Sequence, residues 1–237
     1  MKIILDSMDL AEVGQIVLER SVDKMTDAMC AMLRKQKDYE RAMRRRGEVK
    51  TYFKPIVYKD VDITFNFVPY CNGKKDLAKY GLLFLIIGQF RHSGDNYYFM
   101  SMLDCYKNGK IPQVAIYTTH MLQRYVERHL KDDSPVNFDT FFKFVRETDG
   151  LSIGFEDENY KVENSCQWAT SIGVTCGEVL HPCVLLHKTF INEDTIMKGK
   201  KKTTIDNGYL LSNFMQYDKY GRRFLPRSIA KHFNYAV

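Results

Sequence analysis

The amino-terminal stretch from Asp9 to Arg46 constrains the fold most, because it contains no proline and only one glycine, Gly14. Apolar residues recur along it at spacings of three and four, which places them on one face of a helix. The members of this stripe are Leu18, Val22, Met25, Met29, Met32, Tyr39 and Met43, with Gln36 in the one gap. The pattern predicts a long helix of the kind found in bundles and coiled coils.

The predicted helix ends in a basic run formed by Arg41, Arg44, Arg45 and Arg46. Positive side chains near the carboxyl end of a helix complement its dipole and stay solvated. We favour this interpretation over an arm dedicated to nucleic acid, because charge runs are usually solvated faces. The formal charge of +6 and the pI of about 8.9 suit an anionic partner without requiring one.

The middle of the chain has a different character, because β-branched and aromatic residues occur there in short runs separated by turn residues. The runs are Tyr52–Tyr58, Val61–Val68, Leu82–Phe90, Tyr97–Leu103 and Gln113–Tyr117. Pairs such as Asn72-Gly73 and Asn108-Gly109 supply the turn chemistry. An antiparallel meander is the simplest arrangement of such runs.

A second set of elements follows the meander. The segment beginning at Thr118 and the segment Phe138–Arg146, with Asn137 as its N-cap, are expected to be helices. Further strands are expected at Gln167–Ile172, Val174–Val179 and Val184–Phe190, and a short tail helix near residues 209–216. The fold class is therefore α+β, with a long N-terminal helix and an antiparallel sheet with helices packed on one face. We expect a helical extension over residues 1–50 and one α+β domain over residues 51–237.

The location of the protein is inferred from its cysteines and its apolar runs. Six cysteines are scattered without a Cys-x-x-Cys pair, and the amino terminus lacks the pattern of a signal peptide, so free thiols in the cytoplasm are expected. The longest apolar run, Leu82–Ile87, is far shorter than the roughly 20 residues that span a bilayer as a helix. No membrane partner is expected.

The strongest candidate for chemistry is the segment from Thr118 to His129, which carries His120, Arg124 and Arg128 at four-residue steps. On a helix these three side chains lie within an arc of about 80°. With Thr119 as N-cap, His120 would stand in the first turn, where free backbone N–H groups bind phosphate and a guanidinium can hold two phosphate oxygens.

A purely structural explanation of the same segment is equally consistent with the sequence. Charged side chains four residues apart are common on exposed helices, so Arg124 and Arg128 could be solvated or paired with Glu127 and nearby acids. His129 lies on the apolar side of the helix, which favours a packed or interfacial histidine over a partner for His120.

The second candidate is the strand from Pro182 to Phe190. With a period of two, His187 and Thr189 share one face, and we expect them to face a cleft or to lie on a half-exposed strand. The same region also allows a zinc site, with ligands Cys176, His181, Cys183 and His187. That spacing matches no compact structural zinc pattern, so we expect neither a metal nor another cofactor.

The Thr-Thr-His-x3-Arg-x3-Arg step and the later His187-Lys188-Thr189-Phe190 strand resemble a group of uncharacterised bacterial proteins that share a His-x3-Arg-x3-Arg helix. Some of these have been linked to small α+β ribonucleases of the barnase, colicin and messenger-cleaving toxin type. The resemblance covers about a third of the chain. It implies a metal-free ribonuclease in which His120 and His187 form the acid–base pair and Glu178 is a substitute base. The phosphate would contact Arg124 and Arg128, with Lys188 or Thr189 assisting.

The leading hypothesis is therefore a nuclease-like or RNA-binding protein, and whether it is an enzyme is left open. The alternative is a non-enzymatic interaction module, dimeric through the methionine-rich helix, in which the arginines form salt bridges. A third hypothesis is a binder of a small phosphate-containing ligand. The P-loop, dinucleotide-binding, zinc-protease and serine-hydrolase motifs are absent from the sequence.

Overall fold

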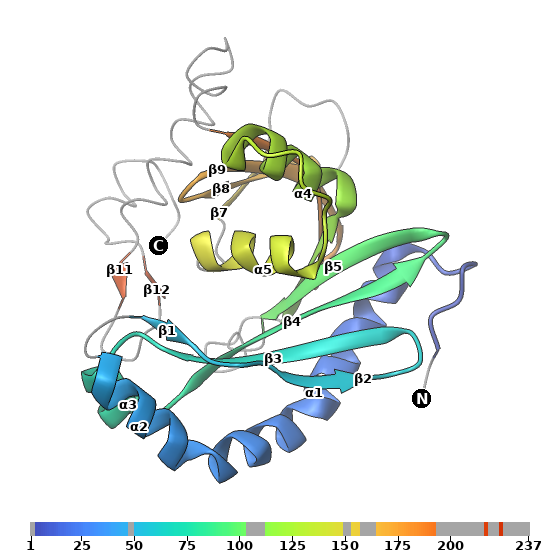
Figure 1. Ribbon diagram of the computed structural model, residues 1–237. Coiled ribbons are helices and arrows are strands. Elements are labelled where there is room, and N and C mark those ends of the chain that lie inside the picture. The colour runs from blue at the N-terminus through green and yellow to red at the C-terminus, as the bar shows by residue number, and fades with distance from the viewer. Residues whose placement is uncertain are drawn as a thin grey trace. The chain divides into compact units, whose positions relative to one another are not determined.

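The computed structural model describes residues 3–46, 50–102, 112–148, 153–156, 165–192, 216–217 and 223–224 (Figure 1). These residues form an α+β structure with a long N-terminal helix and mostly antiparallel strands, which confirms the predicted class. The chain divides into two compact units, Met1–Ile116 with His181–Leu185, and Tyr117–Leu180 with Leu186–Val237. Within the first unit, the N-terminal helix contacts the first strands.

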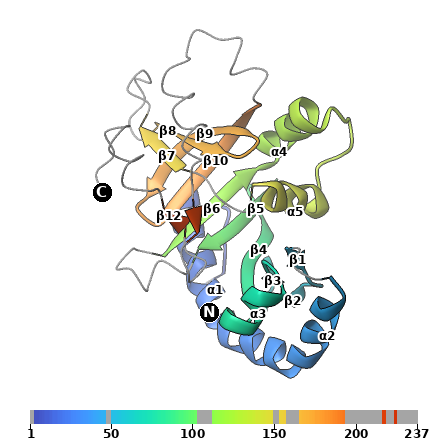
Figure 2. The same cartoon turned by 90° about the vertical axis from the view of Figure 1, so that its left-hand side faces the viewer.

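The N-terminal helical region consists of two helices, α1 (Leu10–Arg34) and α2 (Gln36–Arg46). Asp9 caps α1 through a capping box with Glu12, in which each side chain bonds the other residue's backbone N–H. The two helices are separated by Lys35, whose φ of −101° and ψ of 6° interrupt the helical path. Both views show α2 turning away from α1 at this point (Figures 1 and 2). The prediction of one continuous helix was wrong at this residue.

The face that α1 buries differs from the predicted stripe. Its fully covered apolar side chains include Val13, Val17 and Ala28. Of the predicted row, Leu18, Val22 and Met25 are half-buried, and Met29 is exposed. The face of α1 that packs against the sheet is therefore rotated about the helix axis from the face that the three–four spacing predicts. The stripe agrees with the buried face only from Met32 onward, through Tyr39 and Met43 of α2.

The sheet of the first unit confirms the predicted meander. Its order is β1-β3-β4-β5-β6, and β2 pairs with β3. The strands are β1 (Thr51–Tyr52), β2 (Ile56–Lys59), β3 (Ile63–Cys71), β4 (Leu83–His92), β5 (Asp95–Met102) and β6 (Gln113–Thr118). The helix α3 (Lys74–Tyr80), which the sequence analysis did not predict, connects β3 to β4 and contacts α2.

The first unit contains a buried ion pair that fixes α1 to the turn between β2 and β3. Arg20, which is 4% exposed, bonds through Nη1 to Asp62 Oδ1 at 2.5 Å. The other carboxylate oxygen of Asp62 accepts from the backbone N–H of Ile4 at 2.6 Å. Both Nε and Nη2 of Arg20 are buried and have no hydrogen-bond partner. Asp62 therefore links both the segment at Ile4 and, through Arg20, helix α1 to the turn between β2 and β3.

The second unit contains the candidate segments. Its elements are α4 (Thr119–Tyr125), the π-helix η2 (Val126–Leu130), α5 (Phe138–Glu147), β7 (Ile153–Glu156), β8 (Ser165–Thr170), β9 (Gly173–His181), β10 (Val184–Asn192), β11 (Gln216–Tyr217) and β12 (Arg223–Phe224). The strand order is β10-β9-β8-β7, and β11 pairs with β12. Asn137 caps α5, as predicted. The predicted tail helix lies outside the described residues, apart from Gln216 at the start of β11.

Aromatic rings form the core of the second unit. Tyr125 meets Phe144 and Phe190 edge to face, with centroids 5.2 and 5.7 Å away. Tyr117, at the end of β6, packs against Phe141 and Phe144 of α5. Aromatic pairs in these geometries add to the hydrophobic contribution of burying the rings. This core fixes α4 and α5 against β10 and so positions the residues discussed below.

Candidate functional site

The start of α4 lies beside β10 in the second unit, so the two segments singled out from the sequence do adjoin. Thr118 Oγ1 donates to the backbone oxygen of Lys188 at 3.2 Å and accepts from the backbone N–H of Met121 at 3.0 Å. One hydroxyl therefore caps the helix and joins it to the strand. The N-cap is Thr118, one residue before the predicted Thr119.

His120 is exposed, and Arg124 in the next turn is partly exposed. Arg124 Nη1 pairs with Glu127 Oε2 at 2.8 Å, three residues along the same segment. An exposed pair of this kind contributes little to stability, because water screens it and two side chains lose freedom. Arg124 therefore remains partly accessible to solvent beside its partner Glu127.

A second ion pair lies on the neighbouring strands. Lys188 Nζ of β10 contacts Glu178 Oε1 of β9 at 2.5 Å, and the lysine side chain is 47% exposed. Thr189, the next residue along β10, is half-buried. Both side chains of this ion pair, Lys188 and Glu178, are therefore partly accessible to solvent.

His187 is not at the surface, which overturns the expectation that it faces a cleft. Its side chain is 1% exposed and stacks on Tyr117, with ring centroids 4.5 Å apart. Trp168 of β8 lies against it at a centroid distance of 4.3 Å. The expectation rested on one face of the strand being solvated, whereas Leu185 and Leu186 on opposite faces of β10 are both buried. β10 lies between β6 and β9 in strand order, so both of its edges are paired.

The environment of His187 keeps its ring neutral. Nδ1 shares a hydrogen bond with Thr175 Oγ1 at 2.8 Å, and Nε2 is buried without a partner. Burial away from water lowers the pKa of His187 from 6.5 to about 3. A neutral ring with no route to solvent cannot protonate a leaving group, so the proposed pairing of His187 with His120 is not supported by this geometry.

Arg128 is also placed differently from the expectation. From Val126 onward the helix is a π-helix, whose i to i+5 bonding changes the angle per residue and disrupts the assumed alignment with Arg124. Arg128 Nη1 donates to the backbone oxygen of Phe190 at 2.6 Å, and its own backbone oxygen accepts from Asn192 Nδ2 at 2.9 Å. Its position is therefore explained by anchoring to β10.

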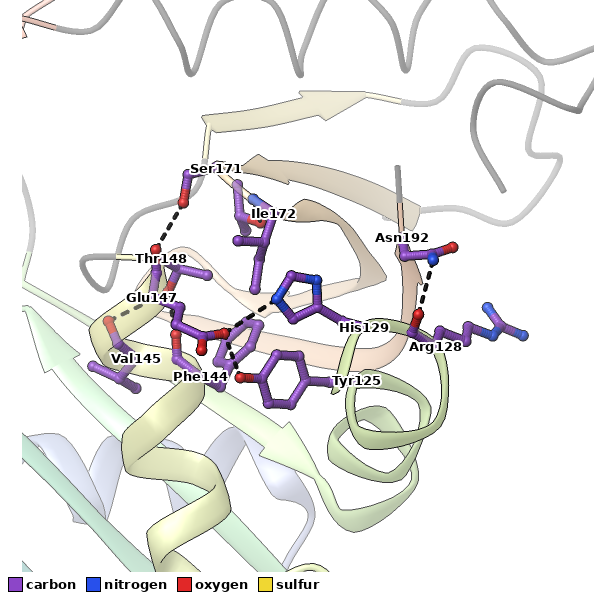
Figure 3. Close-up of polar contacts among 11 residues, drawn as sticks. Tyr125, Arg128, His129, Phe144, Val145, Glu147, Thr148, Ser171, Ile172 and Asn192 are labelled. Atoms are coloured by element: carbon purple, nitrogen blue, oxygen red, sulfur yellow. Dashed lines mark hydrogen bonds and ion pairs between the residues drawn. The ribbon is translucent and has the colours of Figure 1, made fainter. Parts of the chain in front are cut away.

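A polar cluster that sequence reasoning missed joins the end of this segment to α5 (Figure 3). Glu147 Oε2 accepts from the hydroxyl of Tyr125 at 2.5 Å and lies 3.3 Å from His129 Nε2. The rings of Tyr125 and His129 stack with centroids 5.4 Å apart. His129 is therefore a packed histidine, as predicted, while the guanidinium of Arg128 points away from it in Figure 3. The four-residue spacing of Tyr125 and His129 was a signal, but nothing in the sequence identified Glu147 as their partner.

The described residues give no support to the alternative of a zinc site. Among them, no group of three or more histidine, cysteine, aspartate or glutamate side chains is arranged to hold a metal ion. His181 Nδ1 instead contacts the Sγ of Cys183 at 2.9 Å, and both side chains belong to the first unit.

Two further findings bear on function. No helix in the described part of the chain is both long and apolar enough to cross a membrane. The sequence matches no protein-family model, and neither the curated proteins nor the solved structures contain a significant match to it.

Proposed function

We propose that the second unit binds RNA through its phosphate groups, at a surface formed by the start of α4 and the Glu178–Lys188 pair. The observation that carries the proposal is the hydrogen bond from Thr118 to the backbone of Lys188, which holds α4 beside β10. The accessible cationic groups on these two elements are Arg124 and Lys188, and His120 becomes a third when it is protonated. Each arginine or lysine that contacts a phosphate releases a counterion, which favours binding.

The chemistry that this surface would support is metal-free cleavage of the phosphodiester. The carboxylate of Glu178 takes the proton from the 2′-hydroxyl, and the 2′-oxygen attacks phosphorus to give a 2′,3′-cyclic phosphate. Protonated His120 donates its proton to the departing 5′-oxygen. Each positioned proton transfer contributes about a hundred- to ten-thousand-fold in rate. His187 has no part in this scheme.

The ion pairs seen without ligand fit this role. Lys188 holds Glu178 and Arg124 holds Glu127, so each cation has a carboxylate partner that a phosphate would replace. On binding, Lys188 would turn from Glu178 to the phosphate, freeing the carboxylate to act as the base. Two cations beside the pentacoordinate phosphorus would stabilise its added negative charge.

The test measures cleavage and binding of a labelled single-stranded RNA by the full chain in the presence of a chelator. We expect His120→Ala and Glu178→Gln each to lower the cleavage rate at least a hundredfold at saturating RNA, where changes in affinity do not affect the rate. Cleavage that both variants leave intact would refute the acid–base assignment.

Binding is tested separately with a matched pair of arginine variants. Arg124→Ala should weaken binding and reduce the slope of log affinity against log salt concentration by about 0.7. Arg41 is the control, since it forms an exposed three-residue-spaced pair with Asp38 on α2, as Arg124 does with Glu127. If Arg41→Ala and Arg124→Ala have equal effects, or the protein binds no RNA, the proposed surface is wrong.

Two alternatives remain distinct from this proposal. Binding of inorganic phosphate or a mononucleotide as tight as that of RNA would favour a small-ligand site. An interaction module that dimerises through its N-terminal helix is favoured by a different observation in the other unit, the exposed apolar side chains of α1.

The free thiols of Cys30, Cys71, Cys176 and Cys183 are compatible with the cytoplasmic location that we propose.

A further inference from the structure

Arg128 is held at two points, and these contacts leave one edge of its guanidinium group uncommitted. Nη1 donates to the backbone oxygen of Phe190 at 2.6 Å, and Asn192 Nδ2 donates to the backbone oxygen of Arg128 at 2.9 Å. Because backbone and side chain are both fixed to β10, the guanidinium loses little further freedom when it binds a ligand. Arg128 is therefore an ordered hydrogen-bond donor within η2.

The uncommitted edge consists of Nε and Nη2, whose N–H groups point in the same direction. Neither atom has a hydrogen-bond partner in the described part of the chain, and neither is buried, so both face solvent. The same two nitrogens of Arg20 in the first unit are, by contrast, buried. Figure 3 shows the guanidinium of Arg128 directed away from the cluster around Glu147. This edge can hold an oxyanion with two parallel hydrogen bonds, as arginine does with phosphate.

The strand β10 sets the spacing between Arg128 and the proposed RNA surface. Thr118, at the start of α4, bonds to the backbone oxygen of Lys188, and Arg128 bonds to that of Phe190. Two residues along a strand span about 6.6 Å, which is comparable with the step between successive phosphates of an extended nucleic-acid strand. The two contacts on β10 are therefore spaced like neighbouring phosphates of one chain.

We propose that Arg128 binds the phosphate next to the one that Arg124 and Lys188 contact, so that the substrate is an oligonucleotide with at least two phosphates. This inference rests on the proposed function. It differs from the expectation drawn from the sequence, in which both arginines contact a single phosphate. An RNA that reaches the second position gains charge-assisted hydrogen bonds and releases a further counterion.

The test is competition against a labelled single-stranded RNA by 2′-O-methyl oligonucleotides, which lack the hydroxyl needed for cleavage. Without terminal phosphates, a dinucleotide carries one phosphate and a trinucleotide carries two. The unaltered full chain should bind the trinucleotide about tenfold more tightly than the dinucleotide, as expected of a charge-assisted contact. Arg128→Gln should remove most of this gain and leave dinucleotide binding unchanged. An equal gain in Arg128→Gln, or an equal loss for both oligonucleotides, would overturn the proposal.

Two further variants separate charge, hydrogen-bond geometry and folding. Arg128→Lys keeps the charge and a donor for Phe190 but lacks the two-pronged edge, so it should lose much of the gain while keeping the salt dependence. Arg91→Gln removes an exposed arginine from β4 in the first unit and should change neither affinity. Urea unfolding followed by the fluorescence of Trp168 verifies that each variant is folded.

Failure of this proposal is distinguishable from failure of the proposed function. If Arg124→Ala weakens dinucleotide binding but the trinucleotide gain survives in Arg128→Gln, RNA binding stands and only the second phosphate position is refuted. If the unaltered protein binds no RNA, both proposals are wrong.

Discussion

Acidification from pH 7 to pH 5 should destabilise the second unit through a single residue, His187. Its pKa is lowered from 6.5 to about 3 in the folded protein by burial between Tyr117 and Trp168. Between these two values the unfolded chain binds a proton that the folded chain does not, so stability is lost as the pH falls through this range. Below a pH of about 3 the loss reaches its limit.

The magnitude follows from the size of the pKa difference. Each unit of difference corresponds to about 1.4 kcal/mol, and the full difference would therefore remove about 5 kcal/mol at strongly acidic pH. At pH 5 the unfolded histidine is almost fully protonated, and the loss relative to pH 7 is about 2 kcal/mol. A loss of this size is a large fraction of the stability of an ordinary domain.

The assay is urea unfolding followed by tryptophan fluorescence at pH 7 and pH 5. Trp168 is the only tryptophan in the chain and lies against His187, so the signal reports this part of the second unit. His187→Phe keeps a flat ring in the stack but cannot bind a proton, and it should remove most of the pH dependence. His120→Gln, at an exposed position, should preserve it. An unchanged loss of stability in His187→Phe would refute the reasoning.

Three further changes are expected to have measurable effects on urea unfolding. Gly177→Ala should cost at least about 3 kcal/mol, because its Cβ would lie 1.7 Å from a backbone oxygen of β10 that cannot move freely. Tyr125→Phe should cost about 1 to 2 kcal/mol, since it removes the hydroxyl that bonds Glu147. Arg20→Met should cost about 3 to 5 kcal/mol, because Asp62 loses its buried partner. A cost below 1 kcal/mol for Arg20→Met would show that the ion pair is not needed there.

Most secondary structure followed from local sequence alone. The stretch free of proline determined a helical amino terminus, and Asn137 with Thr140 determined where α5 begins, because capping requires only residues three apart. The β-branched and aromatic runs between turn residues located β3 to β6 to within a few residues, since alternation and turn chemistry act over short distances. The sequence did not predict α3, whose seven residues give too weak a periodic signal.

The candidate site was only partly predictable. His120 and Arg124 were identified by residue type and spacing, whereas Glu178 and Lys188 were implied by the resemblance, and all four are at least partly accessible. The prediction that Arg128 lies on the same face as Arg124 assumed a regular α-helix. That assumption does not hold, because the segment from Val126 to Leu130 is a π-helix.

The sequence by itself determined the fold class, the main helices and strands, and the presence of a histidine and cations on one helical segment. Tertiary structure alone decided that His187 is a neutral core residue and that Glu147 bonds Tyr125 and contacts His129. It also decided which face of α1 is buried, since Met29 and Leu33 remain exposed to solvent. Local periodicity shows which residues share a face. It cannot show which face is covered, because burial depends on elements that are distant in sequence and meet only in the folded chain.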